Sequence, residues 1–317
     1  MPGKTHPLRG YLYIATATFF WGVSAAMGRA AFTGRLRLPG PSFAPINPLI
    51  LSQSRATLSL LFLLPILGVR RGWRGLRISR VDSVRMALLG VFGIAAANYF
   101  YYLAIQETTV ATAITVQYTA PIWVLLYMVA RGFQKPTIQK VAAVALAVMG
   151  IAIAIGAFGS DHASLNLIGV AAALLAAFAY AFYNIAGHSL MARHDHWTVM
   201  LYMLLAASVF WLFINPPWKI IAARYSATQW LFLSVFSLTS MLIPFSFYFA
   251  GLRYLEPTRA VVTSCLEPIF AILIAAVALG EAVHPVQGVG MMMVLAAIVS
   301  IQMPEARTRT NVEQQFD

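Results

Sequence analysis

Ten stretches of the chain are apolar over roughly the 20 residues that an α-helix needs to cross the hydrocarbon core of a bilayer. They cover residues 10–32, 47–69, 83–105, 109–131, 138–158, 166–190, 198–215, 228–252, 258–279 and 284–303. Because backbone groups that face lipid must be hydrogen-bonded within the protein, apolar runs of this length are helices and not strands. The sequence therefore predicts an all-α polytopic membrane protein with ten transmembrane helices.

The overall composition supports the same conclusion. Of the 317 residues, 60% are hydrophobic and only 10% are charged, and the mean hydropathy is +0.75. Soluble domains carry roughly a quarter charged residues. A soluble globule of this length has too little interior to hide so much apolar surface. The single cysteine, Cys265, excludes an intrachain disulfide.

The net charge of +12 would suit a nucleic-acid partner if the basic residues formed a binding surface. With ten spans both termini lie on one side, and most arginines and lysines fall on that side, including the basic run 70–80. The positive-inside rule then predicts cytoplasmic N- and C-termini, with residues 304–317 as a flexible cytoplasmic tail. Charge is thus an orientation signal, and no nucleic-acid partner is expected.

The two halves of the chain resemble each other. The stretch A-I-T-V-Q-Y-T-A-P-I-W-V-L at 113–125 aligns with A-V-V-T-S-C-L-E-P-I-F-A-I at 260–272, with Pro121 opposite Pro268. The start of the chain after Gly10 aligns in the same way with the segment after Gly169. The sequence therefore predicts two copies of one five-helix unit.

The predicted copies are residues 10–158 and 166–303. Five is an odd number, so the second copy enters the membrane from the opposite face and the repeats are inverted. Inverted repeats are typical of secondary transporters, which bind their ligand near the middle of the membrane where the repeats meet.

Three motifs also carry a family resemblance: W-G-V-S at 21–24, L-E-P-I-F at 266–270 and L-G-E at 279–281. With the ten spans, they resemble the EamA branch of the drug/metabolite transporter superfamily over about residues 10–303. The aromatic content is most similar to that of the bacterial aromatic amino acid exporters. The resemblance implies a bacterial inner (plasma) membrane protein with a central cavity bounded by spans 1, 3, 4, 6, 8 and 9. The first half departs from the pattern, with Ala120 where the second half has Glu267, and R-G-F-Q from Arg131 in place of the trailing G-E.

The candidate substrate-binding residues are polar or aromatic positions on these spans: Tyr99, Gln117, Tyr118, Tyr180, Asn184, Ser246, Tyr248, Ser264 and Glu267. Ser264 and Glu267 are three residues apart, so they share one helix face, expected to line the cavity. Arg29 and Arg55 lie in the outer halves of their spans, and neither is an obvious partner for Glu267. Glu267 as a simple packing residue stays an open alternative.

Pro121 and Pro268 are interpreted as hinges that bend one helix in each half, with static kinks as the alternative. The aromatic residues near span ends also fit an interfacial belt. His194, Asp195 and His196 resemble a metal site only superficially, and a solvated loop is the simpler interpretation. No metal or cofactor is expected.

These features predict a secondary transporter, not an enzyme, that exports aromatic or other neutral amino acids by alternating access. Other small amphipathic metabolites or drugs are the alternative substrates. An intramembrane enzyme would need several ionisable groups at one depth, and a channel would need a filter or a charged ring. The expected partners are a small-molecule substrate and the lipid bilayer, and the expected state is a monomer.

Overall fold

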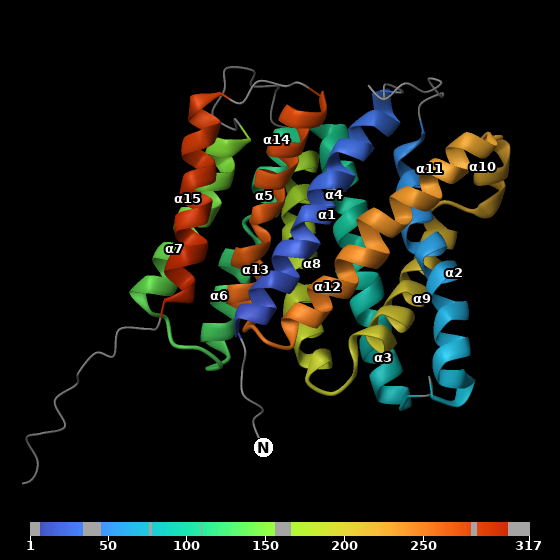
Figure 1. Cartoon of the computed structure of the whole chain (residues 1–317), viewed down its shortest axis with the longest axis horizontal. Coiled ribbons are helices and arrows are strands. Elements are labelled where there is room, and N and C mark those ends of the chain that lie inside the picture. The colour runs from blue at the N-terminus through green and yellow to red at the C-terminus, as the bar shows by residue number, and fades with distance from the viewer. Residues whose placement is uncertain are drawn as a thin grey trace, which may run out of the picture.

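The computed structural model describes residues 7–33, 46–75, 78–108, 110–155, 166–279 and 284–303. Within these ranges the regular structure is entirely helical (Figure 1). The predicted tail 304–317 and the side chain of Arg29 lie outside the described residues. The all-α class is therefore confirmed for the described part of the chain.

A helix or a broken helix lies over each of the ten predicted spans. Six spans are single helices: α1 (Pro7–Thr33), α2 (Pro48–Gly75), α7 (Ile138–Ala154), α8 (Leu167–Met191), α9 (His196–Ile214) and α15 (Pro285–Gln302). Near the end of α2, beyond the apolar span, Gly72 has a non-helical backbone conformation. A short helix, α10 (Pro217–Ala222), follows α9. Seven helical segments of the described chain are long and apolar enough to cross a membrane, and α7 and α15 are shorter apolar helices. The protein is thus a multi-pass membrane protein, and the count of ten stays a prediction.

Two of the broken spans contain a π-helical stretch. α3 (Arg80–Leu88) continues through η1 (Leu89–Ala95) into α4 (Ala96–Glu107). α11 (Ala227–Ser237) continues through η2 (Leu238–Leu242) into α12 (Ile243–Leu252). These are the third span of each predicted half, so both halves interrupt the α-helical hydrogen-bond pattern in the same span. π-Helical turns occur frequently at functional sites.

The other two broken spans end a helix four residues before a proline. α5 (Val110–Gln117) stops ahead of α6 (Ala120–Ala130), which contains Pro121, and α13 (Pro257–Ser264) stops ahead of α14 (Leu266–Leu279), which contains Pro268. Proline has no N–H for the carbonyl four residues earlier, and its ring collides with that carbonyl. Proline therefore favours both breaks, although Pro65 lies within α2 without one.

Helices from the two halves pack against each other. α1 contacts α12 and α14, α8 contacts α4 and α5, α2 contacts α9, and α7 contacts α15. Figure 1 shows α7 and α15 together at one end of the bundle and α2, α9 and α10 at the other, with α1 and α8 between them. The broken spans, with α1 and α8, make up the middle of the molecule, where the candidate residues lie.

The contact between α7 and α15 depends on glycine. A Cβ atom added to Gly150 would lie 2.8 Å from the carbonyl oxygen of Gly290. Small residues allow helix backbones to approach closely in a membrane, where helix association depends on packing and not on the hydrophobic effect. This contact joins the last span of each predicted half.

Candidate functional site

The polar residues at the break in span 9 contact α8. The Ser264 hydroxyl donates to the carbonyl oxygen of Val261 at 2.7 Å. It lies 2.6 Å from the hydroxyl of Tyr180. Because serine has only one hydroxyl hydrogen, Tyr180 is the donor in this second bond. Ser264 is fully buried and Tyr180 is nearly so, so the bond joins α13 to α8 inside the bundle.

Asn184 extends this network to α12. Its amide nitrogen donates to the carbonyl oxygen of Tyr180 at 2.8 Å, and its amide oxygen accepts from the Tyr248 hydroxyl. Asn184 and Tyr248 are both fully buried. Buried polar groups in a membrane need partners within the protein, and here each hydroxyl and amide has one. We call Tyr118, Tyr180, Asn184, Tyr248, Ser264 and Glu267 the polar cluster.

Glu267 joins the polar cluster through Tyr118. The two side chains lie close enough to interact, and the Tyr118 ring packs edge-on against that of Tyr180, with centroids 6.0 Å apart. Arg55 is close enough to interact electrostatically with Glu267. Burial opposes a negative charge on Glu267, whereas the Tyr118 hydroxyl and the Arg55 guanidinium stabilise one.

Several aromatic rings pack against the tyrosines of the polar cluster. The Tyr183 ring packs against that of Tyr180, tilted by 34° and with ring centroids 4.8 Å apart. The ring centroid of Trp21 on α1 lies 5.2 Å from that of Tyr248 and 5.1 Å from that of Phe245, both on α12. Rings and polar groups from both predicted halves therefore lie together.

Three of the predicted residues make other contacts and no described hydrogen bond to the polar cluster. The Tyr99 ring packs near Phe210 and Trp211 of α9. Ser246 donates to the carbonyl oxygen of Leu242 within its own span. Gln117 is half-buried at the end of α5, and in the described part of the chain it makes no hydrogen bond to the polar cluster. Sequence position set the depth of these residues but not the direction of their side chains.

Two residues outside the predicted set also take part. Tyr183 was not among the predicted site residues, although its spacing of three from Tyr180 places both on one face of α8. Arg55 was set aside as a partner for Glu267 because of its depth, yet it is within electrostatic range. An unexplained cation inside an apolar span was the signal that could have found it.

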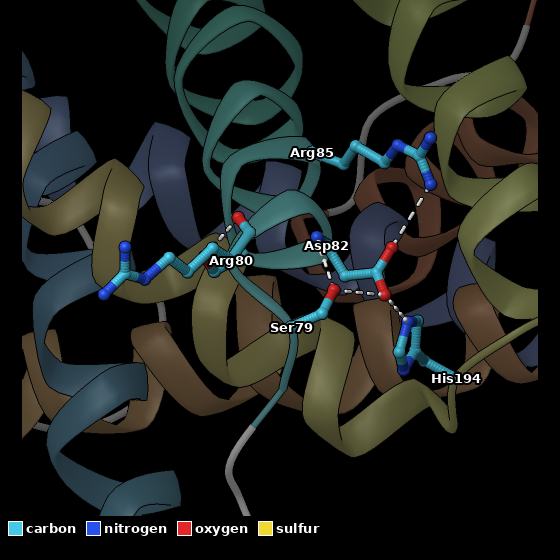
Figure 2. A network of polar contacts seen from close by, with 6 residues as sticks. Ser79, Arg80, Asp82, Arg85 and His194 are labelled. Atoms are coloured by element: carbon cyan, nitrogen blue, oxygen red, sulfur yellow. Dashed lines mark hydrogen bonds and ion pairs between the residues drawn. The ribbon is translucent and has the colours of Figure 1, made fainter.

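The histidine-containing connection between α8 and α9 is a structured contact. His194 Nε2 lies 3.1 Å from the Asp82 carboxylate, which also accepts from the Ser79 hydroxyl and pairs with Arg85 (Figure 2). Asp195 caps α9 by accepting from backbone N–H groups. The residues remain partly exposed, and the described part of the chain groups no three potential metal ligands there. The connection is thus a partly solvated loop, as expected, in which His194 contacts the start of α3.

Known proteins resemble this chain in both sequence and fold. The model of the EamA-like transporter family matches residues 8–156 and again 167–303. The chain is 29% identical over 241 residues to the threonine/homoserine exporter RhtA of Escherichia coli (strain K12), covering 74% of this chain and 75% of that protein. It is 24% identical over 213 residues to an uncharacterized transporter of Archaeoglobus fulgidus, covering 66% and 74%.

A solved crystal structure has the same fold. It aligns with a TM-score of 0.74 at 18% sequence identity and covers 92% of this chain and 96% of the other. Since the family model matches nearly all of the described residues, the assignment covers both halves of the chain. The chain belongs to the EamA-like transporter family, within the drug/metabolite transporter superfamily, and is a transmembrane transporter.

Proposed function

We propose that this transporter exports neutral α-amino acids from the cytoplasm of a bacterium across the inner membrane, as a monomer. The observation that carries the proposal is the polar cluster, where Glu267 lies among tyrosine hydroxyls within electrostatic range of Arg55. Such a site offers both signs of charge and hydrogen-bonding groups to a zwitterion. A relative with a named substrate, RhtA, is a threonine/homoserine exporter.

We further propose that transport follows alternating access between two inverted five-helix repeats, residues 10–158 and 166–303. Paired features support this mechanism. The third span of each half contains a π-helical stretch, and the fourth is broken before a proline. The first span of each half packs on the third and fourth spans of the other half. Two halves arranged in this way can rock against each other around a site between them.

The preference for aromatic substrates stays a prediction. Rings of Trp21, Tyr183 and Phe245 lie beside the polar cluster and would stack with a planar side chain. The named relative points to small hydroxylated amino acids instead. Both classes share the α-ammonium and α-carboxylate groups that the proposed site would bind.

Counterflow in proteoliposomes tests this function. The purified protein is reconstituted in liposomes loaded with one unlabelled amino acid, and entry of the labelled compound is followed. The panel contains threonine, homoserine, phenylalanine, tryptophan and leucine. We expect trans-stimulated exchange of at least one of these, with the compound recovered unchanged. A channel would show no trans-stimulation, an enzyme would yield a new compound, and liposomes no faster than empty ones would refute the amino acid assignment.

A further inference from the structure

Arg55 is a cation inside a candidate membrane span, and its contacts among the described residues are with neutral groups. Its Nη2 donates to the carbonyl oxygen of Ser240 at 2.9 Å, and its Nη1 donates to the side-chain oxygen of Asn98 at 3.4 Å. The guanidinium also lies over the Phe236 ring, 5.8 Å from its centroid. Its Nε is buried and has no hydrogen-bond partner in the described part of the chain. Arg55 therefore has donor capacity that these contacts leave unused.

A charged arginine within a bilayer is costly and usually faces a partner or a substrate pathway. Glu267 is close enough for an electrostatic interaction with Arg55, but the described side chains do not form an ion pair with each other. Tyr101 of α4 interacts electrostatically with both groups, so it lies near both. The positive charge of Arg55 and the negative charge of a deprotonated Glu267 are close but not in contact. A molecule with one carboxylate and one ammonium group could therefore bind between them.

We propose that Arg55 binds the α-carboxylate of a zwitterionic amino acid whose α-ammonium group is bound by Glu267. This inference rests on the proposed function and adds to it a named carboxylate site. Guanidinium presents planar donors that match a carboxylate in two-point fashion, and the unused Nε is one of the donors of such a pair. Arg55 comes from α2 and Glu267 from α14, so the substrate would bridge the two predicted halves.

A purely structural role for Arg55 makes a different prediction. η2 is π-helical, and a donor from Arg55 satisfies the Ser240 carbonyl within it. If this were its whole role, loss of Arg55 would weaken the fold and transport of every substrate alike. A carboxylate-binding role affects only substrates that have a carboxylate. The two roles are therefore separated by comparing an amino acid with its amide.

The experiment measures competition against labelled exchange in proteoliposomes by threonine and threoninamide, and by phenylalanine and phenylalaninamide. Each amide keeps the ammonium group and lacks the carboxylate. In the wild-type protein we expect the amino acid to compete at least about tenfold more strongly than its amide, as for a lost hydrogen bond to a charged group. Arg55→Gln should reduce this preference to about threefold or less, because it should weaken competition by the amino acid and leave competition by the amide unchanged.

The matched control is Ser59→Ala. Ser59 lies one turn further along α2 and donates to the carbonyl oxygen of Ser237 at 3.1 Å. This variant removes a similar bond between α2 and the same span without changing charge, so it should keep the wild-type preference. If Arg55→Gln kept the preference, or weakened acid and amide equally, the carboxylate assignment would be overturned. If the wild-type protein exchanged no amino acid at all, the proposed function would fall as well.

A measurement on the wild-type protein covers the case in which Arg55→Gln does not fold. Phenylglyoxal modifies arginine side chains, and peptide mass spectrometry reports the extent of modification at Arg55. We expect threonine or phenylalanine to slow modification of Arg55 at least about threefold relative to the corresponding amide, since only the acid would occupy the guanidinium. Equal rates with acid and amide would overturn the proposal without any substitution.

Discussion

At the scale of the residue, this protein places a carboxyl group and several hydroxyl groups inside a membrane and gives nearly all of them partners. Glu267 lies within reach of Tyr118, and Tyr180, Asn184 and Ser264 are joined by direct hydrogen bonds. These hydrogen bonds explain how the buried tyrosines, asparagine and serine are stabilised within the fold. Glu267 is the member of the polar cluster that can carry a charge and bind a cationic group of a ligand.

Replacing Glu267 by Gln keeps its size and removes its charge. If Glu267 accepts the substrate ammonium group, the variant should raise the apparent KM for amino acid exchange at equal pH by about tenfold or more, as for a lost hydrogen bond to a charged group. If it instead only carried a coupling proton, exchange at equal pH would be kept and transport driven by a pH gradient would be lost. Counterflow at equal pH and with an imposed gradient separates these roles.

Glu256→Gln is the matched control for this substitution. Glu256 is exposed just before α13, where it accepts from Gln134 at 3.0 Å. Its charge is outside the polar cluster, so exchange should stay near the wild-type level. Wild-type activity in both variants would make Glu267 a packing residue.

The Tyr248 hydroxyl is expected to contribute to stability. Tyr248→Phe leaves the buried amide oxygen of Asn184 without its donor, which should lower the free energy of unfolding by about 0.5–2 kcal/mol. Thermal unfolding in detergent measures the change. Tyr127→Phe, at an exposed position on α6, is the control and should have little effect. Equal Tm values for the two variants would contradict the role of this bond.

At the scale of the element, the prolines explain why two helices break where they do. α5 ends at Gln117 and α13 ends at Ser264, each four residues before its proline. The breaks place the partly or fully buried ends of two short helices at the polar cluster. A broken helix can bend at the break while both of its parts stay packed, which is what a hinge requires.

Pro268→Ala should restore the missing backbone donor and stiffen span 9. We expect the maximal exchange rate to fall severalfold while the apparent KM changes little, because binding groups are kept and bending is opposed. Pro65→Ala provides the control, since Pro65 lies inside α2 at an exposed position away from the breaks. An unchanged maximal rate for Pro268→Ala would identify a static kink.

The α7–α15 contact should be sensitive to a single methyl group. Gly290→Ala would place a Cβ 2.5 Å from the carbonyl oxygen of Gly150, so the helices would have to separate. We expect a loss of about 1–3 kcal/mol in unfolding free energy. Gly288→Ala, two residues earlier in α15, meets open space and should be neutral or slightly stabilising because alanine favours helices. Comparable Tm values for the two variants would contradict this packing.

At the scale of the whole molecule, helices of the two halves are interleaved, since α1 packs on α12 and α14 while α8 packs on α4 and α5. Neither half therefore buries its first helix alone. This arrangement places residues of both halves around the polar cluster. Because the helices pack as one bundle, all spans share a single orientation in the membrane.

Orientation can be checked with two introduced cysteines in a background where Cys265 is replaced by Ala. With both termini cytoplasmic, a cysteine replacing Lys135, between α6 and α7, should be protected from an impermeant thiol reagent in intact cells. A cysteine replacing Ala223, between α10 and α11, should be labelled. Both positions are exposed, so access depends on the side of the membrane. The reverse labelling pattern would refute the predicted topology.

The helical class, the places of the apolar helices and the two prolines near which a helix is interrupted could be read from the sequence alone. Apolar length decides whether a segment crosses a bilayer, and proline removes a specific hydrogen bond, so both effects are local and can be read without a fold. The motifs at 21–24 and 266–270 also indicated the family that the comparisons confirm.

Which polar residues meet depends on how the helices pack. Tyr180, Tyr248 and Ser264 are far apart in sequence and are brought together by the packing of α8, α12 and α13. Tyr99 packs against Phe210 and Trp211 of α9, although its span and residue type fitted the same site. In a membrane protein both lipid-facing and buried positions are apolar, so the sequence pattern specifies the rotation of each helix weakly. Contacts between helices fix that rotation, and with it the partners of Arg55 and Glu267.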